Sequence, residues 1–231
     1  MAREEQEPLY PSTVLSSDPE VSGVRSVGGL VLDAWRRRPV PRRVLGTLSV
    51  FLLLGGLTMV FYPHLTNLYG DWRQSGLEAS FAEPETREAY AARAVLPGEA
   101  LTKVEIPRLE LVSIVVEGTS PGALRAGAGH YEGSALPCEV GNAVVAGHRT
   151  TYSKPFADLH RLRPGDEVVL VTPVGRCVYQ VAGSWVTTPD DVSVLADVRG
   201  ASVLTLTTCH PPGSARERLI VRAELVSSEV A

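Results

Sequence analysis

The sequence Thr-Leu-Thr-Thr-Cys-His-Pro at 205–211 carries the strongest structural and chemical signal in this 231-residue chain. Its alternating, β-branched beginning is typical of a strand, and the Pro-Pro-Gly sequence at 211–213 is typical of the start of a loop. Cys209 is therefore predicted at the end of a strand, where a thiol is partly exposed and its reactivity matters more than its packing. Such a cysteine is a candidate nucleophile, because its thiolate attacks carbonyl carbon readily.

Two further strand ends carry residues that can assist a thiol. The apolar run at 142–146 leads into Gly-His-Arg, and Arg218 directly precedes another apolar run. His148 is the candidate general base that later protonates a leaving amine, and Arg218 is the candidate partner for a developing oxyanion. Arg216 lies on the same side of the strand by the two-residue period, and it is the rival for that role. A lone cysteine at a strand end is more often an inert thiol, but its coincidence with this histidine and arginine favours catalysis.

Short apolar runs separated by Pro and Gly begin at residue 101. Strands are expected at 104–107, 111–116, 142–146, 167–171, 178–181, 203–207 and 219–225, with a short helix at 121–125 and a helical turn at 153–159. The Pro-Val-Gly sequence at 173–175 predicts a hairpin between the two strands that flank it. Many short strands with few helices are typical of a barrel or a sandwich, and this pattern alone does not choose between the two.

The three strand-end motifs resemble those of the sortases, membrane-anchored cysteine transpeptidases of Gram-positive bacteria. That family carries its nucleophile in a T-L-x-T-C strand end, its histidine after a Gly-His step, and its arginine on the strand that follows the cysteine. The resemblance covers roughly 101–225, and the blocks at 129–137 and 146–151 look most like class E, the housekeeping type of high-GC actinobacteria. It implies a mainly β fold, an eight-stranded barrel with short helices, preceded by one transmembrane helix.

The same resemblance implies a reaction and its partners. Cys209, with His148 and Arg218, would cleave a C-terminal sorting signal of the LPxTG kind, or of the LAxTG kind in class E, through a thioacyl intermediate. An amine of a lipid II-type peptidoglycan precursor would then resolve this intermediate and join a secreted protein to the cell wall. Thr208 and Arg216 are the candidates for binding the substrate.

Two alternatives to this function stay open. One is a pilus-type sortase that polymerises pilins, although the short polar stretch at 226–231 favours wall attachment because pilus-type enzymes usually add a C-terminal membrane segment. The other is a catalytically silent, membrane-tethered barrel that only binds peptides.

Residues 44–62 contain no charged side chain and follow a flank with five arginines at 36–43. As a helix this segment would span about 28 Å, which matches a hydrocarbon core of about 30 Å. The lack of a polar face disfavours a buried helix of a soluble domain, and the lack of a following cleavage site disfavours a signal peptide. The arginines predict a single-pass protein of the cell membrane, with a cytoplasmic N-terminus and an extracellular catalytic domain.

We therefore expect four parts along the chain. They are a disordered cytoplasmic tail with a basic flank at 1–43, a transmembrane signal anchor at 44–62, an extracellular stalk at 63–100 and a sortase catalytic domain at 101–231.

Composition bounds the remaining possibilities. The net charge of −4 shows no basic excess that would favour nucleic acid. No Cys-x-x-Cys or His-x-x-x-His spacing occurs, so neither a metal nor a cofactor is expected. Cys138 and Cys177 are the other two cysteines; in an exported domain they could pair and leave Cys209 free, but the sequence does not show that they are close.

Overall fold

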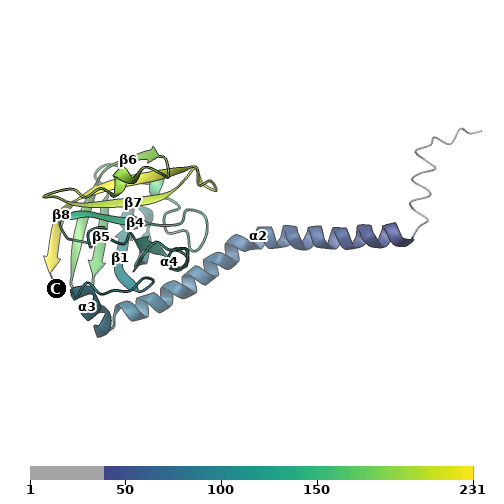
Figure 1. Ribbon diagram of the computed structural model, residues 1–231, viewed down its shortest axis with the longest axis horizontal. Helices are drawn as coiled ribbons and strands as arrows, with labels where there is room; N and C mark the ends of the chain where they lie inside the picture. The colour runs from purple at the N-terminus through teal and green to yellow at the C-terminus, as the bar shows by residue number, and fades with distance from the viewer. Residues whose placement is uncertain (1–38, 231) are drawn as a thin grey trace, which may run out of the picture. The chain divides into compact units, whose positions relative to one another are not determined.

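The structure of the protein is a computed structural model that describes residues 39–230 (Figure 1). Most of the expected cytoplasmic tail lies outside these residues. The chain divides into two compact units, Met1–Gly55 and Gly56–Ala231. The second unit contains the barrel and every residue discussed below as part of the site.

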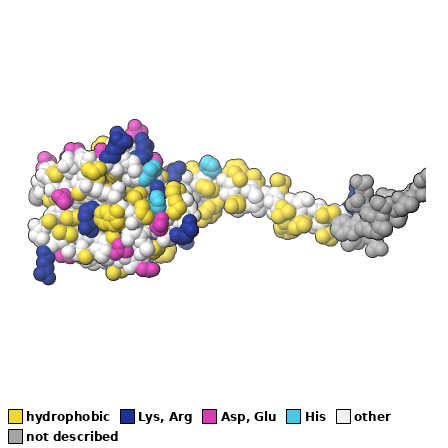
Figure 2. Space-filling model, turned by 90° about the horizontal axis from the view of Figure 1, so that it is seen from above, with side chains coloured by type: hydrophobic (Ala, Val, Ile, Leu, Met, Phe, Trp, Pro, Cys, Tyr) yellow, Lys and Arg dark blue, Asp and Glu magenta, His cyan; other side chains and the backbone are white. Residues whose placement is uncertain are grey.

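Helix α2 (Pro39–Phe81) is a single helix of 43 residues that includes the apolar stretch at 44–62 and continues beyond it. Hydrophobic side chains dominate the surface of its apolar half (Figure 2). In the part of the chain that the structure describes, it is the one helix long and apolar enough to cross a membrane. Pro63 lies within α2, and the shorter helix α3 (Pro84–Ala91) follows it.

Eight strands form a closed barrel, which confirms the predicted fold (Figure 1). The strands are β1 (Ala100–Ile106), β2 (Leu111–Glu117), β3 (Ala128–His130), β4 (Gly141–Ala146), β5 (Glu167–Thr172), β6 (Gly175–Thr187), β7 (Ser202–His210) and β8 (Glu217–Val230). Their order around the barrel is β1-β2-β3-β4-β7-β8-β6-β5. The pairs β2–β3 and β4–β7 are parallel, and the other pairs are antiparallel.

The connections contain short helical elements. These are α4 (Pro121–Ala126) and three 3₁₀ helices, η1 (Pro107–Leu109), η2 (Leu159–Arg161) and η3 (Val192–Leu195). The predicted hairpin is confirmed as β5 and β6, and the predicted short helix is α4. The stretch at 153–159, where a helical turn was expected, consists of turns that lead into η2.

Alternation along the strands divides the side chains between the barrel interior and the outer surface. Leu204 and Leu206 of β7 and Val221 of β8 belong to the main hydrophobic core. By the same period, Thr207 and Cys209 of β7 face outward. The chemistry of the strand ends is therefore presented outside the barrel wall, while the interior is filled by apolar side chains.

A disulfide joins Cys138, in the loop before β4, to Cys177 of β6, with an S–S distance of 2.01 Å. Cys177 is fully buried in the main core. This bond answers the question that the sequence left open, and it leaves Cys209 as the free cysteine of the described chain. The nucleophile candidate is thus not engaged in a structural bond.

Removing this disulfide should destabilise the barrel without touching the strand ends around Cys209. The bond closes a loop with a sequence separation of 39, and loss of a native disulfide typically costs about 2–5 kcal/mol, largely through greater freedom of the unfolded chain. For Cys138→Ala we expect the melting temperature to fall by about 5–15 °C, measured by circular dichroism on the full-length protein in detergent. Reductant should lower the melting temperature of the wild type and leave that of the variant unchanged; an unaltered melting temperature in Cys138→Ala would count against a stabilising role.

Candidate active site

Cys209 lies near the end of β7, directly opposite Arg218 of β8 in the antiparallel register. Residues directly opposite one another in such a pair project to the same face of the sheet, with Cβ atoms about 4.5–5.5 Å apart. The register therefore places the side chains of Cys209 and Arg218 on the same outer face. Both residues are half-buried.

His148 reaches the same place from the other side of β7. Strand β4 runs parallel to β7 with Ala146 opposite Thr207, and the Gly147 amide continues the ladder by donating to the Thr207 carbonyl at 3.0 Å. His148 thus leaves the sheet next to the end of the cysteine strand. Because β4, β7 and β8 are consecutive in the barrel, Cys209 stands between a histidine on one side and an arginine on the other.

Arg149 ties the histidine segment to the end of the cysteine strand. It is only 6% exposed, and its Nη1 donates to the Cys209 carbonyl at 3.1 Å and to His210 Nδ1 at 2.9 Å. Within the described structure its Nε has no hydrogen-bond partner. The sequence analysis did not single out this residue, and its position directly after His148 is the signal that could have found it.

Thr208, predicted to bind substrate, is 3% exposed, and its hydroxyl donates to the Gly147 carbonyl at 2.7 Å. The structure therefore places its side chain beneath the site, where it joins the cysteine strand to the residue before His148. This contact and the Arg149 contacts together join the segment that carries His148 to the end of the strand that carries Cys209.

Arg216 and Arg218, the two candidate arginines, occupy different settings. Arg216 is exposed and lies before β8, where its Nε donates to Ser214 Oγ at 3.3 Å. Arg218 is in the strand opposite Cys209, and its Nη1 donates to the carbonyls of Ala215 and Glu217, each at 3.0 Å. Only Arg218 is held by strand pairing beside the thiol.

The surroundings of His148 disfavour the charged form of its imidazole. Partial burial lowers its pKa below the ordinary 6.5, and the positive charge of Arg125 lowers it further. The ring also packs against Tyr152, with centroids 5.4 Å apart. A neutral imidazole at pH 7 can accept the proton of Cys209, so activity should fall as the pH drops through a value below 6.5.

Replacing Arg125 by glutamine should raise the pKa of His148, because a like charge that opposes protonation is removed. The acid limb of the pH–activity profile should then move to higher pH. Nuclear magnetic resonance titration of the His148 ring measures the shift directly. Arg125→Lys keeps the charge and is the matched control; an equal shift in both variants, or none in Arg125→Gln, would contradict this electrostatic assignment.

A groove of about 370 Å³ lies on the same outer face as the three strand ends. Its floor comes from β4, β7 and β8 through Val144, Ala146, Thr207, Arg218 and Ile220, and one wall comes from the segment at 187–195. The groove thus reaches the catalytic arginine candidate. Apolar residues form most of its floor, and Arg218 connects it with Cys209 through the strand register.

Asp191 shapes the wall segment of this groove. Its carboxylate accepts hydrogen bonds from Thr187 Oγ1, at 2.6 Å, and from the amide of Ser193, at 3.1 Å. Two hydrogen bonds lower the pKa of Asp191 below its usual value: the one from the Ser193 hydroxyl has the larger effect, and the one from Thr187 the smaller. The carboxylate is therefore used to order the wall.

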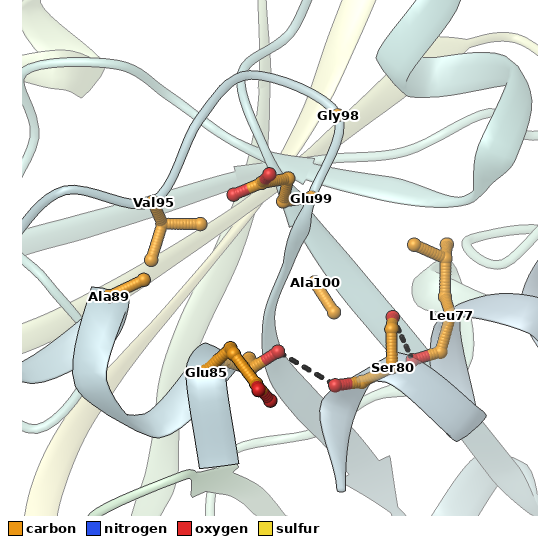
Figure 3. Close-up of a pocket in the computed structure, with 9 residues that line it drawn as sticks. Leu77, Ser80, Glu85, Ala89, Val95, Gly98, Glu99 and Ala100 are labelled. Carbon is orange, nitrogen blue, oxygen red and sulfur yellow. Dashed lines mark hydrogen bonds between the residues drawn. The ribbon is translucent and has the colours of Figure 1, made fainter. Parts of the chain in front are cut away.

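A second cavity, of about 360 Å³, lies between the end of α2, α3 and the start of β1 (Figure 3). It contains two carboxylates, those of Glu85 and Glu99, and the latter accepts a hydrogen bond from the Leu96 amide at 3.0 Å. None of the residues that line it belongs to the strand ends around Cys209. Residues 39–230 contain no group of three or more metal-ligating side chains that could hold a metal ion.

His130 of β3 has a serine and a carboxylate as neighbours, yet it does not form a second nucleophilic site. Its Nδ1 lies 2.8 Å from Glu117 Oε2, and its Nε2 lies 2.9 Å from both Ser134 Oγ and the Ala135 carbonyl. The Glu117 carboxylate and the Ala135 carbonyl both act as acceptors, so each ring nitrogen faces an acceptor and neither is placed to take a proton from Ser134. His130 is 1% exposed, and it has a structural role.

Comparison with known proteins places this geometry in a family. The family model of the sortase domain matches residues 104–226, more than half of the chain. Sortase SrtE1 of Streptomyces coelicolor is 30% identical over 205 residues, which cover 81% of this chain and 58% of that protein. Sortase D of Bacillus subtilis is 32% identical over 155 residues, which cover 65% of this chain and 77% of that protein.

Solved structures agree. Sortase E from Streptomyces avermitilis shares 39% identity with a TM-score of 0.54, over 58% of this chain and 93% of that chain. Sortase E1 from Streptomyces coelicolor, solved with a tripeptide in the active site, shares 34% identity with a TM-score of 0.54, over 59% of this chain and 94% of that chain. These similarities support the resemblance to class E that the motifs indicated. With its closed barrel and its strand-end cysteine, the chain belongs to the sortase family of cysteine transpeptidases.

Proposed function

We propose that this chain is a membrane-anchored transpeptidase that joins secreted proteins to the cell wall. The observation that carries the proposal is the position of Cys209 between His148 and Arg218, on adjacent strand ends beside an apolar groove. A nucleophile, a base and a cation at one point are the parts that acyl transfer requires.

The proposed reaction has two halves. His148 takes the proton of Cys209, and the sulfur attacks the carbonyl carbon of the scissile peptide bond. Arg218 faces the oxyanion that forms, and His148 returns the proton to the leaving amine as the C–N bond breaks. A second amine then attacks the carbonyl carbon of the thioester, the C–S bond breaks as the new amide forms, and the proton that the amine loses passes through His148 to the sulfur of Cys209. Arg149 and Thr208 hold the reacting groups in register.

The proposed donor substrate is a C-terminal sorting signal of the LAxTG kind, with LPxTG as the related alternative. The groove next to Arg218 supports a peptide substrate, because apolar residues form most of its floor. The similarity to class E sortases supports the LAxTG preference. The proposed acceptor is an amine of a lipid II-type precursor.

The proposed location is a single pass through the cell membrane, with the N-terminus in the cytoplasm and the barrel outside. The long apolar helix α2 and the arginines at 36–43 support this orientation. The proposed division of the chain is a tail at 1–43, a transmembrane anchor at 44–62, a stalk at 63–100 and a catalytic domain at 101–231.

The test uses the full-length protein in detergent with Leu-Ala-x-Thr-Gly and Leu-Pro-x-Thr-Gly peptides and a small amine as acceptor. We expect a new amide between the threonine and the acceptor, formed faster from the alanine peptide. Faster turnover of the proline peptide would overturn the LAxTG preference. Transfer only to a pilin lysine peptide would support the pilus-type alternative, and peptide binding without product would support a silent barrel.

A further inference from the structure

We propose that the part of helix α2 beyond the apolar stretch belongs to the active site, where it holds the loop that carries His148. We call residues 67–74 of α2 the clamp segment and residues 148–156 the histidine loop. In this view the clamp segment is a positioning element: it touches neither sulfur nor substrate, and it acts on catalysis through the imidazole. The proposal rests on the proposed role of His148 as the base.

The clamp segment is hydrogen-bonded to the histidine loop at Ser153. The Ser153 amide donates to Asn67 Oδ1 at 3.1 Å, and its hydroxyl donates to Asp71 Oδ1 at 2.7 Å. Gly70 lies between these two contacts, and a Cβ there would stand 2.2 Å from Ser153 Oγ and 2.9 Å from the Ser153 nitrogen. Helix and loop therefore approach so closely that only glycine fits at this position.

The histidine loop has an unfavourable backbone conformation that contacts with α2 stabilise. Tyr152, Ser153 and Lys154 have φ angles of 52°, 58° and 39°, although none of them is glycine. For a residue other than glycine the left-handed conformation is costly, and it persists only when contacts with the surrounding structure hold it. The base of the loop is fixed separately, because the Phe156 amide donates to the His148 carbonyl at 3.1 Å and the Phe156 side chain is fully buried in the core.

Tyr152 transmits the position of the loop to His148. Its ring packs on the imidazole at 5.4 Å between centroids, and it also contacts residues of α2 and α4. Its hydroxyl lies 3.2 Å from that of Tyr62, its ring lies 6.5 Å from the ring of Tyr69, and Arg125 stands 5.9 Å above it. Movement of the helix would therefore move the tyrosine that covers the base.

The clamp segment is itself fixed to the barrel. Gln74 accepts from the Ile114 amide at 2.7 Å and donates to the carbonyls of Ile114 and Ala126, at 3.1 and 2.7 Å. Leu77, one turn further, packs with residues of β1, β2 and α4 in a second core cluster. The helix thus joins the barrel wall to the histidine loop, and the same helix carries the proposed membrane anchor.

The test compares two single substitutions in α2 of the full-length protein in detergent. Gly70→Ala forces a Cβ into Ser153, whereas Gly76→Ala, in the same helix, meets no atom within 4 Å. Both changes alter helix propensity in the same way. A difference between the thioacylation rates of the two variants therefore measures the effect of the contact between the clamp segment and the histidine loop. We expect Gly70→Ala to slow thioacylation of Cys209 by roughly 10- to 100-fold, since small misplacement of a catalytic group has effects of that size, and Gly76→Ala to match the wild type.

The second readout is the titration of His148, which a purely structural role would not change. Burial lowers the pKa of His148 in the wild type, so release of the loop in Gly70→Ala should return that pKa toward 6.5. Nuclear magnetic resonance follows the ring, identified by its loss in His148→Gln. Ser153→Ala removes the hydroxyl's hydrogen bonds to Asp71 Oδ1 and to the Asn67 carbonyl without a clash and keeps the amide bond to Asn67 Oδ1. It should shift the pKa of His148 in the same direction if Gly70→Ala does not fold.

The outcomes separate this inference from the proposed function. Suppose that the wild type is active and that Gly70→Ala and Gly76→Ala share the same thioacylation rate and the same pKa of His148. This result would overturn the role of the clamp segment and leave the proposed transpeptidase function intact. If the wild type acylates neither peptide, the proposed function fails, and the His148 titration still decides whether the helix positions the loop. A shift in Gly76→Ala as large as that in Gly70→Ala would also overturn the inference.

Discussion

Replacing Cys209 by alanine should abolish turnover of a sorting peptide while leaving the barrel folded. The thiol is the only group at the site that can form a thioacyl bond, because Cys138 and Cys177 are joined to each other and no other cysteine exists in the chain. No general base can compensate for a missing nucleophile, so we expect no product above the uncatalysed background. The measurement is product formation by liquid chromatography with full-length protein.

The fold should survive this change for a structural reason. Cys209 is half-buried on the outer face of β7 and is not part of the barrel core, so truncation leaves no internal cavity. Its carbonyl, which receives the Arg149 hydrogen bond, is also unchanged. A melting temperature within a few degrees of wild type is the control. Residual turnover at more than a trace level in the folded variant would show that another group performs the chemistry.

Replacing Arg218 by alanine should lower kcat/KM by about a hundredfold or more, because removal of one donor to an oxyanion typically has an effect of that size. Arg218 is paired with Cys209 across β7 and β8 and lines the groove, whereas Arg216 is exposed and bonds to a nearby serine. Arg216→Ala should therefore change kcat/KM by less than about threefold, as is usual for an exposed residue away from the chemistry. Steady-state kinetics on both variants measures the difference.

Arg218→Lys refines this comparison. It keeps the positive charge and loses the planar donor geometry, so it should recover part but not all of the lost rate. A mild effect of Arg218→Ala together with a large effect of Arg216→Ala would reverse the assignment. Equal effects of the two alanine variants would show that neither arginine is specifically placed by the strand register.

The barrel could be predicted from sequence where strands are β-branched and bounded by Pro or Gly. The run at 203–207 is an example, since it lies within β7. The hairpin around 173–175 is another, since it joins β5 and β6 near the expected position. Strand β3 was missed because Ala-Gly-His carries no β-branched residue. Its strand conformation comes from pairing with β2 and β4, and a single-sequence pattern does not report such pairing.

The three strand-end residues could also be singled out from sequence, because motif order and strand ends are local signals. The residues that position them could not. Arg149 meets Cys209 across 60 positions of sequence, and Ser153 meets Asn67 across 86. Contacts of this separation depend on how the barrel and helix pack, and no local pattern of residue types specifies them. Thr208, a candidate for binding the substrate, shows the same limit: its side chain is buried and donates to the Gly147 carbonyl, 61 positions away in the sequence.

Helix α2 shows a different limit. Hydropathy distinguishes the uncharged stretch at 44–62 from the polar residues that follow, because it reports which solvent surrounds a segment. It says nothing about where backbone hydrogen bonding stops, and the helix continues to Phe81. The continuation is what brings Asn67, Gly70 and Asp71 to the histidine loop.

The most direct test of the central claim is the intact mass of the full-length protein after incubation with a Leu-Ala-x-Thr-Gly peptide and no acceptor amine. The account predicts an added mass equal to the peptide's acyl portion, located on Cys209 and absent from Cys209→Ala. The result that would contradict it is an unchanged mass with either sorting peptide while Cys209 still reacts with an alkylating reagent. In that case the thiol would be accessible and reactive, but it would not be the nucleophile of a sorting reaction.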